Sequence, residues 1–344
     1  MDIGLGIGGS PGEAGALAAR AEEAGFESCW AAETTNTAFV AAAAAISATS
    51  RIRVGTAVAL AFPRSPTITA MTAFDLDELS RGRFLVGLGS QVKAVAERRF
   101  SVPFDHPAPR LREYVEAMRT VWAANRGEEV VHEGRFYTIT MPGFHAAPQP
   151  GRRNVPVYLA AVNRIMARVC GEVADGLIGH PLASPRYLAE VVRPAVAEGA
   201  ERTGRAPSDV NLTASVIASV ADDPDVARRE AKLQIAFYAT TRTYRRILEL
   251  HGRAHLVPEL RAAFDAGDND RLTALVDDEL CDAIAATGSA DEVVERVRAW
   301  EPVADRVIVS GPWFGVGPAR SAANHDALIE AFGRVLRDQV GHHG

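Results

Sequence analysis

The chain has 344 residues, of which 47% are hydrophobic and 23% are charged. These are ordinary values for a globular protein, and they exclude a disordered chain, a collagen and a disulfide-rich miniprotein. The formal net charge of −6 gives no general attraction to nucleic acid or to an anionic membrane surface. We therefore expect a globular fold, built as one large domain or two medium ones, that takes a small-molecule substrate.

The sequence gives no clear sign of a disulfide framework, a metal site or a leader segment. Cys29, Cys170 and Cys281 lie far apart, so they indicate neither a disulfide framework nor a metal site, and the histidines show no ligand spacing. The segment that begins at Met1 has no basic region followed by a long apolar run. The apolar stretch 38–48 is too short to span a bilayer. We expect a soluble cytoplasmic protein without a metal or a membrane partner.

Eight short apolar runs alternate with longer amphipathic segments. Most of the runs lack regular polar alternation, which is typical of parallel strands that are covered on both faces. The expected strands cover residues 3–7, 28–32, 52–58, 84–88, 155–161, 176–178, 210–220 and 306–309.

Helix signals lie between these runs. Gly25 ends one amphipathic stretch, and Ser65 followed by Pro66 opens another. The expected helices cover residues 13–24, 66–80, 164–173, 185–202, a stretch from 224 past 231, 291–300 and 324–340. Eight strand–helix units predict an α/β fold, the (β/α)8 TIM barrel; an open doubly wound sheet is the main alternative, but it usually has fewer strands.

Two segments exceed the strand–helix alternation. The first, from about residue 127 to about residue 151, has the pattern of a β-hairpin on the rim, with its turn at Gly134. The second, from about residue 232 to about residue 286, has the pattern of a helical insertion. They follow the fourth and the seventh strand, so we expect both to wall a pocket at the carboxyl ends of the strands. The glycine-rich segment 4–9 spans a strand itself, which makes it a weak dinucleotide motif. We interpret residues 1–344 as a single barrel domain.

Two strand ends suit a phosphorylated or flat ligand. Val162, Asn163 and Arg164 combine a helix-capping residue, free backbone N–H groups and a guanidinium, which together favour phosphate. A plain Asn cap beside a solvated Arg is the alternative, and the local sequence leaves both open. Residues 87–90, which end at Ser90, are glycine-rich; they permit close approach either of a flat ligand or of the neighbouring backbone.

Two further strand ends carry titratable groups. Glu33 ends the second strand, where a carboxylate can bind the polar edge of a ligand or move a proton; an ion-paired carboxylate is the commoner alternative. His180 follows Gly179 at the end of the sixth strand and either contacts a ligand or is an ordinary hydrogen-bonded rim histidine. None of these groups makes a nucleophile, so we expect a bound cofactor to carry the chemistry.

Several motifs together resemble a known family. They are RVGTAV (53–58), FPRSP (62–66), LSRGRFLVGLGSQVK (79–93), PVYLAA (156–161), GEVADG (171–176) and AFY (236–238). Together they resemble the bacterial luciferase-like oxidoreductases, in the branch that uses the deazaflavin coenzyme F420 and in its methylene-tetrahydromethanopterin reductase-like subgroup. The resemblance implies a (β/α)8 barrel, F420 as cofactor and a homodimer.

The resemblance also implies a reaction and a set of site residues. The reaction is hydride transfer between the deazaflavin and a small organic substrate such as an imine, an activated alkene, a carbonyl or an alcohol. The implied residues are Ala57 and Val58, joined by a cis peptide bond against the ring; Glu33 at its polar edge; Val162, Asn163 and Arg164 around the phosphate; and Gly179 and His180 beside it. Ser90 is a further candidate cofactor contact, and Glu33 and Gln91 are the catalytic candidates.

Two other functions remain open at this stage. The same fold suits an FMN-dependent monooxygenase that activates oxygen. A ligand-binding barrel without catalysis is the third hypothesis, because Thr37-Ala38 and Val95 stand where relatives tend to carry an Asp-Pro pair and a histidine.

Overall fold

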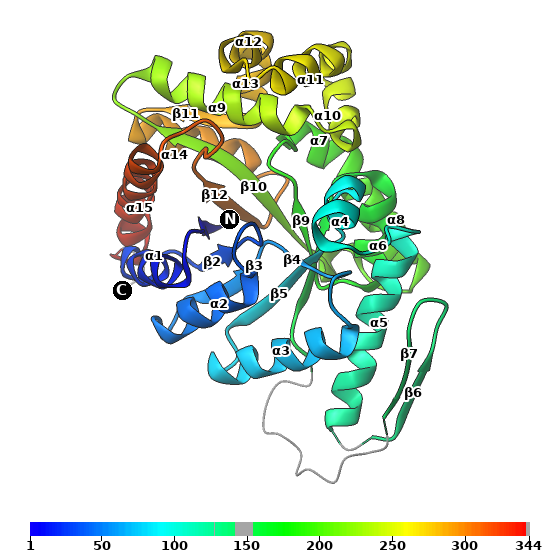
Figure 1. Cartoon of the computed structure of the whole chain (residues 1–344). Coiled ribbons are helices and arrows are strands. Elements are labelled where there is room, and N and C mark those ends of the chain that lie inside the picture. The colour runs from blue at the N-terminus through cyan, green and yellow to red at the C-terminus, as the bar shows by residue number, and fades with distance from the viewer. Residues whose placement is uncertain (127, 142–153, 342–344) are drawn as a thin grey trace.

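Eight parallel strands close into a barrel. The computed structural model describes residues 1–126, 128–141 and 154–341 (Figure 1). In order around the barrel, the strands are β1 (Asp2–Ile7), β2 (Ser28–Ala31), β3 (Arg53–Thr56), β5 (Phe84–Gly89), β8 (Val157–Ala161), β9 (Gly176–Gly179), β10 (Asn211–Val220) and β12 (Arg306–Ser310). The circle is complete because β12 pairs in parallel with both β10 and β1. The predicted (β/α)8 barrel is confirmed, and the open sheet is wrong.

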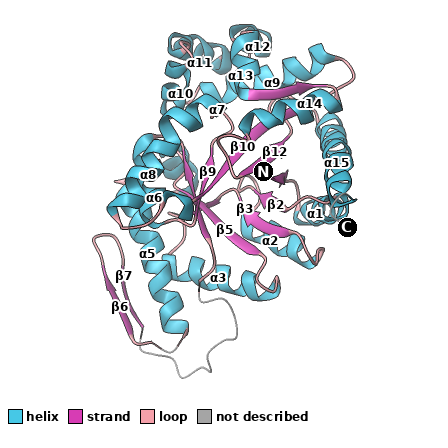
Figure 2. Ribbon diagram, turned by 180° about the vertical axis from the view of Figure 1, so that it is seen from behind, coloured by secondary structure: helices cyan, strands magenta, loops and turns pink. Residues whose placement is uncertain are grey.

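Helices surround the barrel, as Figure 2 shows from behind. Those outside the large insertion are α1 (Pro11–Ala24), α2 (Ala38–Ser47), α3 (Pro66–Leu79), α4 (Lys93–Phe100), α5 (Pro107–Asn125), α6 (Arg164–Val173), α7 (Pro185–Tyr187), α8 (Arg193–Arg202), α14 (Ala290–Val297) and α15 (Pro318–Gly341). After β10 come α9 (Pro224–Ala239), α10 (Arg245–Leu250), α11 (Val257–Asp265), α12 (Asn269–Leu275) and α13 (Asp278–Ile284). Two short strands, β4 (Ala59–Leu60) and β11 (Ala285–Gly288), pair in parallel with β5 and β10, respectively.

Most of the predicted helices are present, with shifted ends. Helix α6 has the predicted bounds, whereas α1 starts at Pro11 because Ser10 caps it and exchanges hydrogen bonds with Glu13. The expected helix 185–202 contains a π-helical segment, Leu188–Val192. Helices α4 and α5 and strand β11 were not predicted.

Large side chains fill the barrel interior. Trp30 is 1% exposed and packs with Leu85, Tyr158, Ile178 and Ile308. A Cβ atom on Gly55 would lie 2.4 Å from the Trp30 ring, so the neighbouring strand must carry glycine there. The barrel is therefore a packed core and not a pore.

A buried arginine closes the amino-terminal end of the barrel. Arg306 is 1% exposed at the start of β12, and its guanidinium lies 5.6 Å from the centroid of the Trp30 ring. Its Nη2 atom is 3.2 Å from an Asp2 carboxylate oxygen, and its Nη1 atom donates to the Tyr158 hydroxyl at 3.3 Å. In TIM barrels it is the opposite end, where the strands finish, that carries the active site.

A hairpin packs along the outside of the barrel. Strands β6 (Val130–Glu133) and β7 (Thr138–Met141) pair in antiparallel fashion. The Glu113 carboxylate of α5 accepts hydrogen bonds from the N–H groups of Arg135, Phe136 and Tyr137 at 3.0, 2.7 and 2.7 Å. The hairpin thus lies against α5 (Figure 1), and its contribution to a pocket over the strand ends stays a prediction. The rest of the predicted segment 127–151 lies partly outside the described residues.

The fold predicts a pH-dependent contribution from one carboxylate. Burial raises the pKa of Glu22, but hydrogen bonds from the N–H groups of Ile52, Arg51 and Ser50 outweigh it, so the pKa lies below its ordinary value. A lowered pKa stabilises the folded chain above the pKa of the unfolded carboxyl, about 4.3. We expect Glu22→Gln to reduce the unfolding free energy by about 1–2 kcal/mol at pH 7. Urea unfolding should show this difference shrinking as the pH falls below about 4.

Glu23→Gln is the matched control, because Glu23 is the exposed neighbour on the same helix. A pH-independent loss in Glu22→Gln, or an equal loss in both variants, would contradict the role given to Glu22.

Candidate active site

The carboxyl ends of the barrel strands form a mouth in which the predicted site residues meet. In TIM barrels this face carries the active site. Residues that follow six strands contribute to it: Glu33 after β2, Ala57 and Val58 after β3, Ser90 and Gln91 after β5, Val162 to Arg164 after β8, His180 after β9, and Trp313 after β12.

An apolar shelf follows β3. The peptide bond between Ala57 and Val58 is cis, as the resemblance implied. Both side chains are half-buried and pack on the interior cluster around Trp30. A Cβ atom on Gly89 would lie 2.6 Å from Val58 Cγ2, so glycine at this position leaves room for the shelf. Ala57 and Val58, which we call the mouth shelf, thus present an apolar surface of the kind on which a planar ring packs.

Glu33 is fixed by an arginine that sequence analysis did not predict. Its carboxylate forms a bidentate pair with Arg64, with Nη2–Oε1 at 2.5 Å and Nη1–Oε2 at 2.8 Å. Oε2 also accepts a hydrogen bond from Leu60 N at 2.7 Å, and the Glu33 side chain is only 6% exposed. The ion-paired alternative is therefore the one observed. This pair connects the end of β2 to the segment that follows the mouth shelf.

The start of helix α6 has the geometry of an anion site. Asn163 is its N-cap: Oδ1 accepts from Met166 N at 3.0 Å, and the Asn163 carbonyl accepts from Ala167 N at 2.9 Å. Among the described residues, nothing accepts a hydrogen bond from the N–H groups of Arg164 and Ile165. Two free donors at a helix N-terminus favour phosphate. The Asn cap and a phosphate site are thus compatible here.

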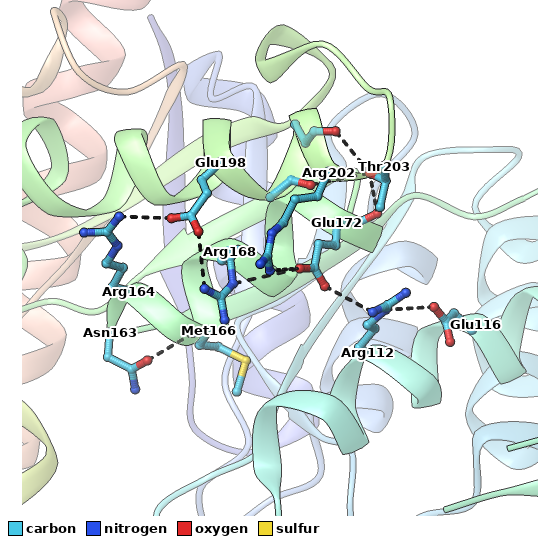
Figure 3. Close-up of polar contacts among 12 residues, drawn as sticks. Arg112, Glu116, Asn163, Arg164, Met166, Arg168, Glu172, Glu198, Arg202 and Thr203 are labelled. Atoms are coloured by element: carbon cyan, nitrogen blue, oxygen red, sulfur yellow. Dashed lines mark hydrogen bonds and ion pairs between the residues drawn. The ribbon is translucent and has the colours of Figure 1, made fainter. Parts of the chain in front are cut away.

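The Arg164 side chain lies away from these donors. Figure 3 shows its guanidinium directed at Glu198 on α8, with Nη2–Oε2 at 3.0 Å. Glu198 also contacts Arg168 at 3.3 Å, and these two arginines, Arg164 first, lower the pKa of the Glu198 carboxyl. Arg164 is 70% exposed, so water screens its charge. In this arrangement the backbone N–H groups supply more to an anion than the guanidinium does.

His180 is a neutral group in an aromatic wall. Burial lowers its pKa to about 3, so the imidazole carries no charge at neutral pH. Its Nδ1 atom accepts a hydrogen bond from Leu182 N at 3.2 Å. The ring centroid lies 4.0 Å from that of Tyr244 and 4.8 Å from that of Tyr238. His180 therefore acts as a packing and hydrogen-bonding group and not as a cation.

Two residues after β5 help to shape the mouth. Gln91 has a left-handed φ of 62°, and its side-chain oxygen accepts from Val92 N at 2.9 Å at the start of α4. Ser90 Oγ donates to the Gln91 carbonyl at 3.2 Å. At Gly87 it is the neighbouring backbone that approaches closely, because a Cβ atom there would lie 1.8 Å from the Thr56 carbonyl oxygen. Contacts of Ser90 and Gln91 with a ligand remain predictions.

Sequence reasoning missed three groups that shape the mouth. Besides Arg64, these are Tyr244, which packs on His180, and Gln234, which is 1% exposed on α9. Gln234 Oε1 accepts hydrogen bonds from the N–H groups of Trp313 and Phe314, both at 2.9 Å, and so holds the loop after β12. The FPRSP motif contained Arg64, but only its proximity to Glu33 in the fold shows its role.

Neither a metal cluster nor a membrane-spanning helix is present among the described residues. Within residues 1–126, 128–141 and 154–341, no three His, Cys, Asp or Glu side chains are grouped so as to hold a metal ion. In the same part of the chain, no helix has both the length and the apolar character that crossing a membrane requires.

Comparisons with known proteins agree with this architecture. The family model described as luciferase-like monooxygenase matches residues 3–305. An uncharacterized protein of Mycobacterium tuberculosis is 42% identical over 295 residues, which cover 83% of this chain and 86% of that protein. The solved structure of a coenzyme F420 dependent tetrahydromethanopterin reductase from Methanopyrus kandleri superposes with a TM-score of 0.80 at 26% identity, covering 97% of this chain and 96% of that one.

A flavin-binding enzyme shares the fold at lower identity. The oxygenating constituent of 3,6-diketocamphane monooxygenase from Pseudomonas putida, solved with FMN, has a TM-score of 0.67 at 19% identity and covers 97% of this chain and 98% of that one. At this identity the likeness supports the fold alone.

The Glu33–Arg64 pair yields a stability prediction. Arg64→Met leaves a buried carboxylate without its cation, and we expect it to cost about 3 kcal/mol of unfolding free energy. Adding Glu33→Gln to Arg64→Met should restore about half of that loss, because the buried charge is gone while an acceptor remains for Leu60 N. Guanidinium unfolding of the wild type, both single variants and the double variant measures the coupling.

Arg53→Met is the control, since the Arg53–Glu27 pair is 50% and 42% exposed and is worth about 1 kcal/mol or less. Equal losses of unfolding free energy in Arg53→Met and Arg64→Met would contradict a stabilising role for the buried Glu33–Arg64 pair.

Proposed function

Because the chain belongs to the luciferase-like monooxygenase family, which its family-model match over residues 3–305 establishes, we propose that it is an F420-dependent oxidoreductase. In this proposal it transfers a hydride between the bound deazaflavin and a small organic substrate with an electron-poor carbon, such as an imine, an activated alkene or a carbonyl. The likeness to the F420-dependent reductase of Methanopyrus kandleri supports the choice of cofactor.

One structural observation carries the proposal. The mouth combines an apolar shelf at Ala57 and Val58 with two free backbone donors at Arg164 N and Ile165 N. The shelf suits the face of a planar ring, and the donors suit a phosphate joined to that ring. Both features follow strands of the same closed barrel, on the same face. Their chemistry fits a flat phosphorylated redox cofactor such as F420.

The titratable groups around the mouth support hydride chemistry. The Glu33 carboxylate is paired with Arg64, and His180 is neutral because burial lowers its pKa to about 3. Burial raises the pKa of Tyr244 to about 12, so its phenol stays protonated. Neither His180 nor Tyr244 is therefore poised to exchange a proton near pH 7. When bound, the deazaflavin supplies the hydride, and the protein supplies orientation and electrostatics.

Each residue of the mouth then has a role in the proposal. The mouth shelf contacts the ring, and Arg164 N and Ile165 N bind the phosphate. Glu33 is a positioning residue, because it acts through Arg64 and Leu60 on the segment next to the shelf. Ser90, Gln91, Val162, Gly179 and His180 complete the proposed lining.

The direct test is cofactor binding followed by turnover. We expect F420 to quench the protein's intrinsic fluorescence on binding, with FMN binding at least tenfold more weakly, and reduced F420 to be oxidised in the presence of a cyclic imine or an enone. Preferred binding of reduced FMN with oxygen consumption would replace the proposal with the monooxygenase hypothesis. Tight F420 binding without hydride transfer to any imine, enone or carbonyl tested would favour a non-catalytic barrel.

Arg164 offers a test of the phosphate donors. Asn163 has extended backbone angles, φ −120° and ψ 163°, so a proline can follow it at the first helical position without disturbing the helix. Arg164→Pro removes both the N–H donor and the guanidinium, whereas Arg164→Ala removes the guanidinium alone. We expect Arg164→Pro to weaken F420 binding by about tenfold or more relative to Arg164→Ala.

Circular dichroism and thermal unfolding serve as the controls for folding in this pair. Equal F420 affinities for the folded Arg164→Pro and Arg164→Ala variants would remove the start of α6 from the phosphate site.

A further inference from the structure

Two adjoining clefts border the helical insertion, outside the mouth itself, and the larger of them also borders the start of α4. The larger, about 790 Å³, is lined by residues 92–95 at the start of α4 and by residues 240–243, 245, 254, 255, 257, 258 and 261. The smaller, about 470 Å³, is lined by Arg242, Thr243, Arg245, Arg246 and Glu249. Arg242, Thr243 and Arg245 line both, so we treat the two as one feature, the cationic cleft.

The charge of this cleft is opposite to that of the chain. Five lining side chains are cations, and Glu249 is the one acid among the residues that line it. The cations are Lys93, Arg242, Arg245, Arg246 and Arg261. The whole chain, by contrast, has 43 acidic and 37 basic residues. A local excess of cations in a concave site attracts and holds anions.

Two of the arginines are free to bind a ligand. Three of the five cations have acidic partners: Lys93 pairs with Glu97, Arg245 with Glu249 at 3.3 Å and Arg261 with Asp265 at 3.0 Å. Arg242 and Arg246 are exposed, and neither has an ion-pair or hydrogen-bond partner for its guanidinium in the part of the chain that the structure describes. A guanidinium presents its donors in a fork that matches a carboxylate or a phosphate.

The cationic cleft connects to the mouth on two sides. On one side, Val92 and Lys93 line it directly after Gln91, which follows β5. On the other side, Tyr244 stands between cleft residues Thr243 and Arg245, and its ring packs on His180 at 4.0 Å between centroids. A molecule held in the mouth therefore has the cleft within reach of an extended tail.

We propose that the cationic cleft binds the carboxylate-rich tail of a small molecule whose reactive end occupies the mouth. The inference rests on the proposed function for the position of that reactive end, while the cleft and its charge are independent of it. Two sources supply this chemistry. One is the cofactor, since F420 carries glutamyl carboxylates beyond its phosphate, and the other is a substrate with an acidic tail.

The test compares tail-bearing and tail-free ligands in matched variants. Arg242→Gln/Arg246→Gln removes the two unpaired cations of the cleft. Arg298→Gln/Arg334→Gln is the control with the same change of charge, on exposed helical side chains elsewhere that are 56% and 51% exposed. The probes are F420 with a glutamyl tail, the same deazaflavin phosphate without glutamyl residues, and tri-γ-glutamate alone. Dissociation constants come from fluorescence quenching and from calorimetry at low and high salt.

Two results would support the proposal and assign the tail. If the tail is the cofactor's, tail-bearing F420 binds wild type and the control about tenfold more tightly than the tail-free form does, and Arg242→Gln/Arg246→Gln abolishes the difference. If the tail is the substrate's, both F420 forms bind equally, and tri-γ-glutamate binds the F420-loaded wild type but not Arg242→Gln/Arg246→Gln. In either case, high salt weakens the contribution of the tail.

The proposal is overturned if tail length makes no difference and tri-γ-glutamate binding is absent or unaffected by Arg242→Gln/Arg246→Gln. Failure of the proposed function is distinguishable from this outcome. In that case neither deazaflavin binds, and the titration of cofactor-free protein with tri-γ-glutamate still decides whether the cleft holds a polycarboxylate.

Discussion

Closure of the parallel sheet is the constraint on which the rest of the structure depends. When β12 pairs with β1, all eight strands point the same way around one packed interior, so their carboxyl ends meet at a single face. Trp30 and its neighbours fill the space between the ends, and Arg306 closes the amino-terminal end. Groups that lie far apart in the sequence, such as the mouth shelf and the start of α6, are thereby brought to the same mouth.

Within the mouth, charge is mostly used to hold the chain in place. The Glu33–Arg64 pair ties two strand ends together, and the Arg164–Glu198 pair connects α6 with α8 (Figure 3). His180 contributes an aromatic surface without a charge. Such an arrangement suits the proposed role, in which the protein orients a ligand and a bound cofactor carries the reactive centre. The unpaired guanidinium groups of Arg242 and Arg246 lie outside the mouth, in the cationic cleft, where they suit recognition of a ligand rather than chemistry.

The sequence predicted the barrel well because buried parallel strands leave an apolar signal that depends little on their neighbours. It also predicted α6, because Asn163 is a strong local cap, and the cis bond at Ala57–Val58, through the family resemblance. Local patterns could not predict pairings that the fold creates. Glu33 and Arg64 are 31 residues apart, and the cationic cleft joins α4 to an insertion more than a hundred residues later. The packing of the hairpin on α5 was likewise not predictable, because it depends on Glu113, which no local pattern singled out.

The central claim is that one mouth holds a planar redox ring on the shelf after β3 and its phosphate at the start of α6. A crystal structure of the protein with F420 tests it most directly. The account predicts phosphate oxygens within hydrogen-bond distance of Arg164 N and Ile165 N, and the deazaflavin ring in van der Waals contact with Ala57 and Val58. A phosphate bound at any other strand end, or a ring that does not touch the shelf, would contradict it.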